Sequence, residues 1–120
     1  MNDATVRFTV ALSIAEGKLE AFEAIAQTMV AGSESEAGTL VYEFCLSNDR
    51  KRCRLVEKYV DADATVAHFT GPVVQELVPK LLEVSTISGF EVYGDPGPKA
   101  AEMMIAMGAE IFEHWHGFSR

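Results

Sequence analysis

Three side chains in this sequence have types and positions suited to acid–base chemistry. His68 carries an imidazole whose ordinary pKa of about 6.5 allows proton uptake at neutral pH, so it is the candidate general base. Glu57 alternates with Leu55 and Tyr59 on an expected strand, so its carboxylate needs a hydrogen-bond partner or a raised pKa. Tyr42 offers a hydroxyl that could stabilise a developing oxyanion. Together they predict an acid–base site in which Glu57 orients the imidazole.

Each of these residues also has a structural interpretation. A lone histidine on a helix often only caps or packs, and this alternative stays open for His68. Glu57 could instead hold the sheet to a helix N-terminus through backbone N–H groups. The sequence alone leaves both interpretations standing.

Aromatic side chains could wall a cavity for a flat ring beside these groups. Large aromatic residues also simply fill cores, which is the commoner role of each taken singly. The tail aromatic, Trp115, follows a Met-rich segment that could act as a lid or as a strap across a dimer. The candidate substrate-binding residues are Phe44, Tyr59, Phe69, Phe90 and Trp115.

Short catalytic and metal-binding motifs are absent from the sequence. It lacks the signatures of serine hydrolases, phosphate-binding loops, dinucleotide folds and zinc proteases. His114 and His116 point about 200° apart on a helix, so they cannot share a metal there. Cys45 and Cys53 are expected on opposite faces of a hairpin, which disfavours a disulfide. We therefore expect no metal site.

Length and charge restrict the partners. The chain has 120 residues, which suits one domain, and 48% of them are hydrophobic, as in globular proteins. A net charge of −8 repels phosphate backbones and anionic lipid, so neither nucleic acid nor a membrane is an expected partner. The first residues lack a basic signal-peptide segment, and no apolar stretch approaches the roughly 20 residues of a bilayer span. We expect a cytoplasmic protein.

Hydrophobic periodicity predicts the elements that must position these residues. Alternating apolar residues indicate strands, and apolar residues at three- and four-residue spacing indicate amphipathic helices. The expected elements are a strand over 5–14, a helix ending near Gly32, strands over 39–46 and 52–60, a helix from Asp61 or Asp63 to Phe69, a helical piece over 73–83 with Pro79 kinking it or starting a new turn, and a strand over 84–93.

This order, β-α-β-β-α-β, predicts an α+β ferredoxin-like fold with a four-stranded antiparallel sheet and helices on one face. Residues 1–95 form that domain. Residues 96–120 add an extension with a helix over 99–116, packed on the domain or on a dimer partner. The uncovered sheet face is expected to carry an apolar patch, which predicts a homodimer through that face. The patch residues are Val41, Cys45, Val56 and Val60.

The hairpin between the second and third strands decides whether Tyr42 and Glu57 share a face. A two-residue turn at Asn48 and Asp49 places Tyr42 opposite Leu55 and gathers the large apolar side chains on the face of Glu57. A loop one residue longer would move Tyr42 to the other face. We predict the two-residue turn.

Several segments resemble the antibiotic biosynthesis monooxygenase family. Residues 38–43, Gly-Thr-Leu-Val-Tyr-Glu, are similar to its G-x-L-x-Y-E strand, and residues 56–61 to its E-x-[WY]-x-D strand-to-helix turn. Ala67 and His68 match an A-H position on the following helix, and the segments 10–17 and 117–120 are compatible. The resemblance covers about residues 5–95. It implies a dimeric α/β barrel and quinol or polyphenol monooxygenases that need neither metal nor flavin. It also implies haem-degrading members, isomerases and members without assigned activity.

The leading hypothesis is a cofactor-independent monooxygenase that oxidises a quinol or polycyclic phenol. Its partners are a small aromatic substrate and dioxygen, with His68 as base and Tyr42 as donor to the oxyanion. Alternatives are a non-catalytic dimer that binds small molecules or serves in stress response, and an isomerase of a small carbonyl compound. Haem degradation fits poorly, because Val10 replaces the expected asparagine and Trp115 lies in the tail.

Overall fold

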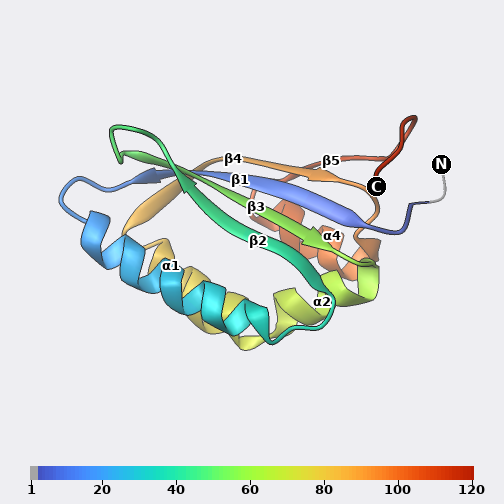
Figure 1. The fold of residues 1–120 in the computed structure, drawn as a ribbon, viewed down its shortest axis with the longest axis horizontal. Helices are drawn as coiled ribbons and strands as arrows, with labels where there is room; N and C mark the ends of the chain where they lie inside the picture. Colours follow the sequence, from blue (N-terminus) through green and yellow to red (C-terminus); the bar gives the residue numbers. More distant parts are fainter. Residues whose placement is uncertain (1–2) are drawn as a thin grey trace.

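A computed structural model describes residues 3–120. The expected β-α-β-β-α-β order is present, followed by a further helix and a further strand (Figure 1). The elements are β1 (Val6–Ile14), α1 (Leu19–Glu34), β2 (Thr39–Leu46), β3 (Arg52–Tyr59), α2 (Ala62–Thr70), the π-helical turn η1 (Val73–Leu77), α3 (Val78–Leu81), β4 (Ser85–Tyr93), α4 (Gly97–Ala106) and β5 (Glu110–Phe112).

The strands form one mixed sheet in the order β2-β3-β1-β4-β5. β1 runs antiparallel to β3 and β4, and β2 runs antiparallel to β3. β5 pairs with β4 in parallel at the edge. The α+β ferredoxin-like fold is therefore confirmed. The prediction of four antiparallel strands is wrong, because the chain after α4 returns to the sheet and adds a fifth strand.

The C-terminal helix is shorter than the predicted helix over 99–116. Gly108 has a φ of +94°, in the left-handed region that favours glycine. The N–H of Ala109 donates to the carbonyl of Met104 (3.0 Å), and the N–H of Gly108 donates to that of Ile105 (2.9 Å). This pair of bonds is a Schellman ending, which satisfies the last carbonyls of α4 and turns the chain toward β5.

The β2–β3 hairpin has a different register from the predicted one. Tyr42 lies opposite Glu57 and Phe44 opposite Leu55, so the pairing is displaced by two residues. A longer loop replaces the two-residue turn, with Arg50 at a φ of 63° and the Ser47 N–H bonded to the Arg52 carbonyl. A displacement of two residues preserves the faces of both strands, so Tyr42 and Glu57 still point to the same side.

The helix that carries His68 begins as expected. Asp61 is its N-cap, and the Asp61 carboxylate accepts a hydrogen bond from the N–H of Ala64 at 2.8 Å. Beyond α2 the chain forms the π-helical turn η1, and Pro79 occupies the first turn of α3. Proline fits there because its missing N–H has no partner in a first helical turn, so it starts a new turn instead of kinking a long helix.

The core lies between the sheet and the helices. Figure 1 shows α1, α2 and α4 on the same side of the sheet. Alternate residues of β1 point to that side, and burying each large apolar side chain contributes about 1.5–3 kcal/mol. The buried side chains of β1 are Val6, Phe8, Val10 and Leu12.

The other face of the sheet is more polar than expected. Val41 and Val56 are half-buried on it, whereas Cys45 is exposed. Arg54 and Lys58 alternate with Val56 along β3, so charged side chains interrupt the predicted apolar patch. Within residues 3–120, no helix has both the length and the apolar character needed to cross a bilayer.

Candidate functional site

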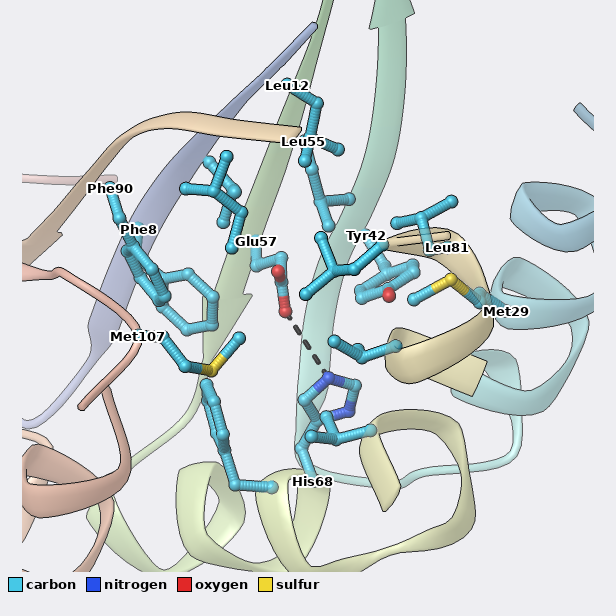
Figure 2. Close-up of a pocket in the computed structure, with 16 residues that line it drawn as sticks. Phe8, Leu12, Met29, Tyr42, Leu55, Glu57, His68, Leu81, Phe90 and Met107 are labelled. Carbon is cyan, nitrogen blue, oxygen red and sulfur yellow. Dashed lines mark ion pairs between the residues drawn. The ribbon is translucent and has the colours of Figure 1, made fainter. Parts of the chain in front are cut away.

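A small cavity of about 40 Å³ lies between the sheet and the helical layer (Figure 2). Its walls are almost wholly apolar. Phe8 and Phe90 contribute rings from β1 and β4, and Leu55 contributes from β3. Leu81 of α3 and Met107, just after α4, lie on the helical side. A site of this lining favours a flat, uncharged ligand.

Two titratable groups meet at the wall of this cavity. The Glu57 Oε1 atom lies 3.4 Å from His68 Nε2, the contact marked in Figure 2. Tyr59 donates its hydroxyl hydrogen to the same Glu57 oxygen at 2.5 Å. The side chains of His68 and Glu57 are only 2% and 5% exposed. The geometry therefore joins an imidazole, a carboxyl group and a phenol where water is largely excluded.

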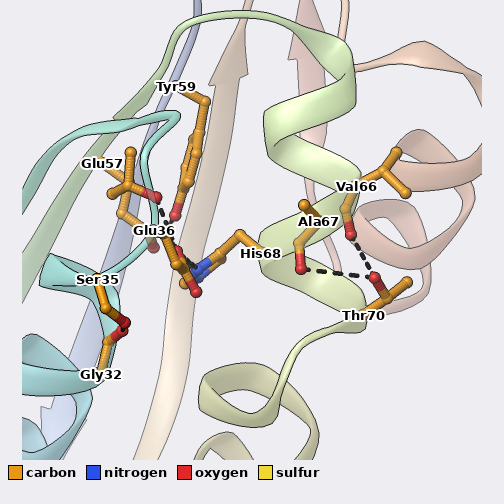
Figure 3. A network of polar contacts seen from close by, with 10 residues as sticks. Gly32, Ser35, Glu36, Glu57, Tyr59, Val66, Ala67, His68 and Thr70 are labelled. Carbon is orange, nitrogen blue, oxygen red and sulfur yellow. Dashed lines mark hydrogen bonds and ion pairs between the residues drawn. The ribbon is translucent and has the colours of Figure 1, made fainter.

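A second carboxylate, that of Glu36, holds the other side of the imidazole. Glu36 belongs to the connection between α1 and β2, and its Oε1 atom lies 2.8 Å from His68 Nδ1 (Figure 3). Thr39 donates its hydroxyl hydrogen to that oxygen at 2.7 Å. Sequence reasoning missed Glu36. It lies in a polar connection 32 residues before His68, and no motif or periodicity marks it.

Burial sets the protonation of the pair. It raises the pKa of the Glu57 carboxyl to about 8, although the hydrogen bond from Tyr59 works in the opposite direction. Burial also lowers the pKa of the His68 imidazole, while the bond to Glu36 partly offsets that effect. Both groups are therefore neutral at pH 7, with Glu57 able to give a proton and His68 able to take one.

The two tyrosines nearest the Glu57 carboxyl, Tyr42 and Tyr59, stay protonated. Burial, assisted by the nearby Glu57 carboxyl, raises the pKa of Tyr42 and that of Tyr59 far above the ordinary phenol range. The Tyr42 ring lines the cavity, and its centroid lies 5.5 Å from that of His68. The Tyr42 hydroxyl is thus a neutral hydrogen-bond donor.

Close packing brings the β2 strand against the histidine helix. A Cβ atom at Gly38 would collide with the Cβ of Ala64 on α2. The carbonyl of Gly38 accepts the N–H of Val60 at 2.9 Å. Only glycine allows this approach, which places the connection carrying Glu36 next to His68.

The structure brings together five of the predicted site residues. All of them line the cavity. They are Tyr42, Glu57, His68, Phe69 and Phe90. Tyr59 does not line it, but stacks on Phe8 with ring centroids 5.6 Å apart and contacts the site through Glu57.

Phe44 and Trp115 do not lie at the cavity, contrary to prediction. Phe44 packs edge-on against Phe22 of α1, with ring centroids 6.2 Å apart, beside a separate surface groove. Trp115 is 88% exposed. It shares a cleft with Arg7 and Tyr93 on the other face of the sheet, because the chain beyond β5 leaves the helical layer. Trp115 therefore does not cover this cavity, and the alternative of a strap across a dimer stays a prediction.

Metal ligation has no visible basis within the described residues. Between residues 3 and 120, no three His, Cys, Asp or Glu side chains are grouped so that they could hold a metal ion. The chemistry that the arrangement can perform with its own groups is proton transfer.

Comparison with known proteins gives one family and many similar structures. Residues 5–80 match the family model described as antibiotic biosynthesis monooxygenase. No curated protein matches the sequence.

Three solved structures illustrate the similarity. MupZ from Pseudomonas fluorescens is 26% identical, with 98% of this chain and 96% of that chain covered and a TM-score of 0.82. Protein SO0527 from Shewanella oneidensis is 27% identical, with coverage of 76% and 88% and a TM-score of 0.64. SnoaB from Streptomyces nogalater, described as a cofactor-independent oxygenase, is 16% identical, with coverage of 79% and 96% and a TM-score of 0.67. The likeness to SnoaB concerns the fold alone.

Proposed function

The chain belongs to the antibiotic biosynthesis monooxygenase family, and we propose that it oxidises a quinol or polycyclic phenol with dioxygen, using no metal or organic cofactor. The observation that carries the proposal is the position of the His68 imidazole at an apolar cavity walled by aromatic rings. SnoaB, a cofactor-independent oxygenase of the same fold, adds support by analogy.

The reaction begins with removal of a proton from the substrate hydroxyl. A free phenol has a pKa of about 10, so a neutral imidazole within hydrogen-bond reach is a suitable base. His68 Nε2 accepts the proton, and the Tyr42 hydroxyl donates a hydrogen bond to the phenolate oxygen. The electron-rich phenolate then transfers one electron to dioxygen, and the two radicals combine into a peroxide at a ring carbon.

The later steps balance without an external reductant. His68 returns its proton to the peroxide, the O–O bond breaks, and the ring carbon loses its hydrogen. One oxygen atom remains on the ring as a carbonyl and the other leaves as water. The substrate supplies all the electrons and is oxidised to a quinone. The apolar walls protect the intermediates from water.

Oxygen uptake with a panel of naphthohydroquinones tests the proposal. We expect the wild type to consume oxygen faster than the uncatalysed reaction and to incorporate one labelled oxygen atom into the product. The variant His68→Gln should lose about 10²–10⁴-fold in rate, because it lacks a base. His116→Gln, in the exposed tail, is the matched control and should retain full activity.

Two results would contradict the proposal in different ways. If His68→Gln equals the wild type, the base is wrongly assigned. If the wild type binds the hydroquinones but adds nothing to their autoxidation, the protein is a binding dimer and not an oxygenase.

A second function has its own supporting observation. Glu57 and His68 are adjacent and both neutral, so one can donate a proton while the other accepts one. This arrangement can move a proton from one carbon of a carbonyl compound to another atom of the same molecule. An isomerase of this kind would turn over without oxygen and would lose activity above about pH 8, where Glu57 ionises. Anaerobic exchange of a ketone's α-hydrogens with deuterated water separates it from the oxygenase.

A further inference from the structure

Glu36 differs from the other members of the polar network in its access to solvent. Its side chain is 24% exposed, whereas that of His68 is 2% exposed. One carboxylate oxygen serves both of its partners, His68 Nδ1 at 2.8 Å and Thr39 Oγ1 at 2.7 Å. The network therefore runs from the surface, through the imidazole, to the buried carboxyl of Glu57 (Figure 3).

The contact with Glu36 determines which nitrogen of His68 carries hydrogen. A carboxylate only accepts hydrogen bonds, so a neutral imidazole bonded to it must carry its hydrogen on Nδ1. The lone pair is then on Nε2, the nitrogen on the side of Glu57 and the cavity. The opposite tautomer would leave Nε2 unable to accept a substrate proton.

We propose that Glu36 is a positioning residue that fixes the Nδ1–H tautomer of His68 and stabilises the imidazolium formed when Nε2 accepts a proton. Its catalytic consequence rests on the proposed function, whereas the tautomer is a property of the ligand-free protein.

The fold of the connection does not depend on this carboxylate. The Glu36 N–H donates to the Ser33 carbonyl and the Thr39 N–H donates to the Glu36 carbonyl, both at 3.1 Å. Contact between Gly38 and Ala64 holds the same connection against α2. Backbone bonds and close packing already maintain the turn, so the side chain of Glu36 is free to act on His68.

The other groups around the imidazole contribute no negative charge at neutral pH. Glu57 and Tyr59 face it from β3, and Tyr42 faces it from β2. The pKa of Glu57 is about 8, and those of both phenols are raised, so all three are protonated at pH 7. Glu36 also makes the shorter contact with the imidazole, at 2.8 Å from Nδ1, whereas Glu57 Oε1 lies 3.4 Å from Nε2.

Isotope-edited NMR of the imidazole nitrogens tests the assignment without a substrate. We expect the ligand-free wild type to carry hydrogen on Nδ1 of His68 at pH 7. Glu36→Leu, which offers no acceptor, should give a mixture of tautomers and a lower His68 pKa, by about one unit or more. Glu36→Gln should retain the tautomer through its amide oxygen and still lower the pKa. Glu34→Leu, an exposed acidic residue of α1, is the control and should change neither.

Kinetics with a naphthohydroquinone supply the second readout. Glu36→Leu should lower kcat by at least about tenfold with little change in KM, and Glu36→Gln should recover part of the loss. Hydrogen on Nε2 in the wild type, or an unchanged tautomer and pKa in both Glu36 variants, would overturn the proposal. If the NMR results hold but the wild type oxidises no hydroquinone, the proposed function fails and the tautomer assignment stands. Because Glu36→Gln preserves the shape of the side chain, it provides the readout should Glu36→Leu not fold.

Discussion

The carboxyl group of Glu57 and the imidazole of His68 are held together where water is scarce, and this decides their charge. Each would be ionised or half-ionised in water near neutral pH, and each is neutral in the folded protein. A neutral acid and a neutral base side by side can then give a proton to a ligand and take one from it. The reactivity thus arises from burial of ordinary residues.

Replacing Glu57 by glutamine should change how stability depends on pH. A carboxyl whose pKa is about 8 when folded and about 4.5 when unfolded binds more protons in the native state, so it makes stability fall as pH rises between those values. The variant Glu57→Gln has no ionisable group at this position, so this contribution to the pH dependence of stability is absent. The quantity to compare is the free energy of unfolding of the wild type minus that of Glu57→Gln, measured by urea unfolding. We expect this difference to fall by about 2–5 kcal/mol between pH 5 and pH 8.

The control for this experiment is Glu43→Gln, which alters an exposed acid on the neighbouring strand. Its unfolding free energy should follow that of the wild type at every pH. The lowered pKa of His68 has the opposite effect, because it makes the free energy of unfolding rise with pH up to about 6.5. His68 is present in all three proteins, so this effect is common to them. A pH-independent difference between the wild type and Glu57→Gln would mean that Glu57 is ionised in the fold.

The site was only partly predictable from residue types. His68, Glu57 and Tyr42 were identified because alternation and motif positions place them on one side of the sheet and on the facing helix. Glu36 could not be identified, since the direction of a side chain in an irregular connection depends on tertiary packing. Trp115 was misplaced for a similar reason, because its position depends on where the chain leaves β5.

At the scale of elements, the glycine of the β2 motif has a packing role. Gly38 lets the start of β2 contact α2 at Ala64, which sets the distance between Glu36 and His68. We expect Gly38→Ala to destabilise the fold by about 1–3 kcal/mol through overpacking, and to weaken the contact between Glu36 and His68.

Gly89→Ala is the matched control for Gly38→Ala. A Cβ at Gly89 would be 3.5 Å from the Ala11 Cβ, an ordinary contact, so thermal unfolding should change little. Equal melting temperatures for the two variants would contradict the packing role of Gly38.

The elements that were predicted correctly are marked by a cap residue or by a regular apolar pattern. The errors occur where an apolar pattern continues past a residue that ends the element. The Asp61 cap and the alternation along β1 are local, and both are present in the structure. Met103, Met107, Ile111 and Trp115 continue a helical spacing past Gly108, so the periodicity concealed the helix end. The predicted register of the β2–β3 hairpin was wrong because turn residues show that the chain reverses but do not fix how many residues the loop contains.

At the scale of the whole molecule, we propose a homodimer through the uncovered face of the sheet, where apolar side chains lie among charged ones. Val41 and Val56 are half-buried there, and the tail beside this face exposes Trp115 and Phe118 at 88% and 77%. Pairing of two such faces would cover apolar surface that a monomer leaves in water.

Sedimentation analysis checks the dimer. The wild type should sediment with twice the monomer mass, and Val56→Arg should shift it to the monomer, because it adds a cation between Arg54 and Lys58 on β3. Ile105→Arg, an exposed apolar position on α4 in the helical layer, should leave the mass unchanged. A wild type that sediments as a monomer at all concentrations would contradict this proposal.

The overall charge and the cavity select the same kind of ligand. A net charge of −8 disfavours anions, and the apolar lining disfavours any charged molecule, which leaves a neutral and largely apolar ligand. The most direct measurement is a crystal structure with a naphthol bound. We predict that the ring lies between Phe8 and Leu81, with its hydroxyl within hydrogen-bond distance of His68 Nε2. A naphthol bound elsewhere, or with its hydroxyl turned away from His68, would show that His68 is not the base.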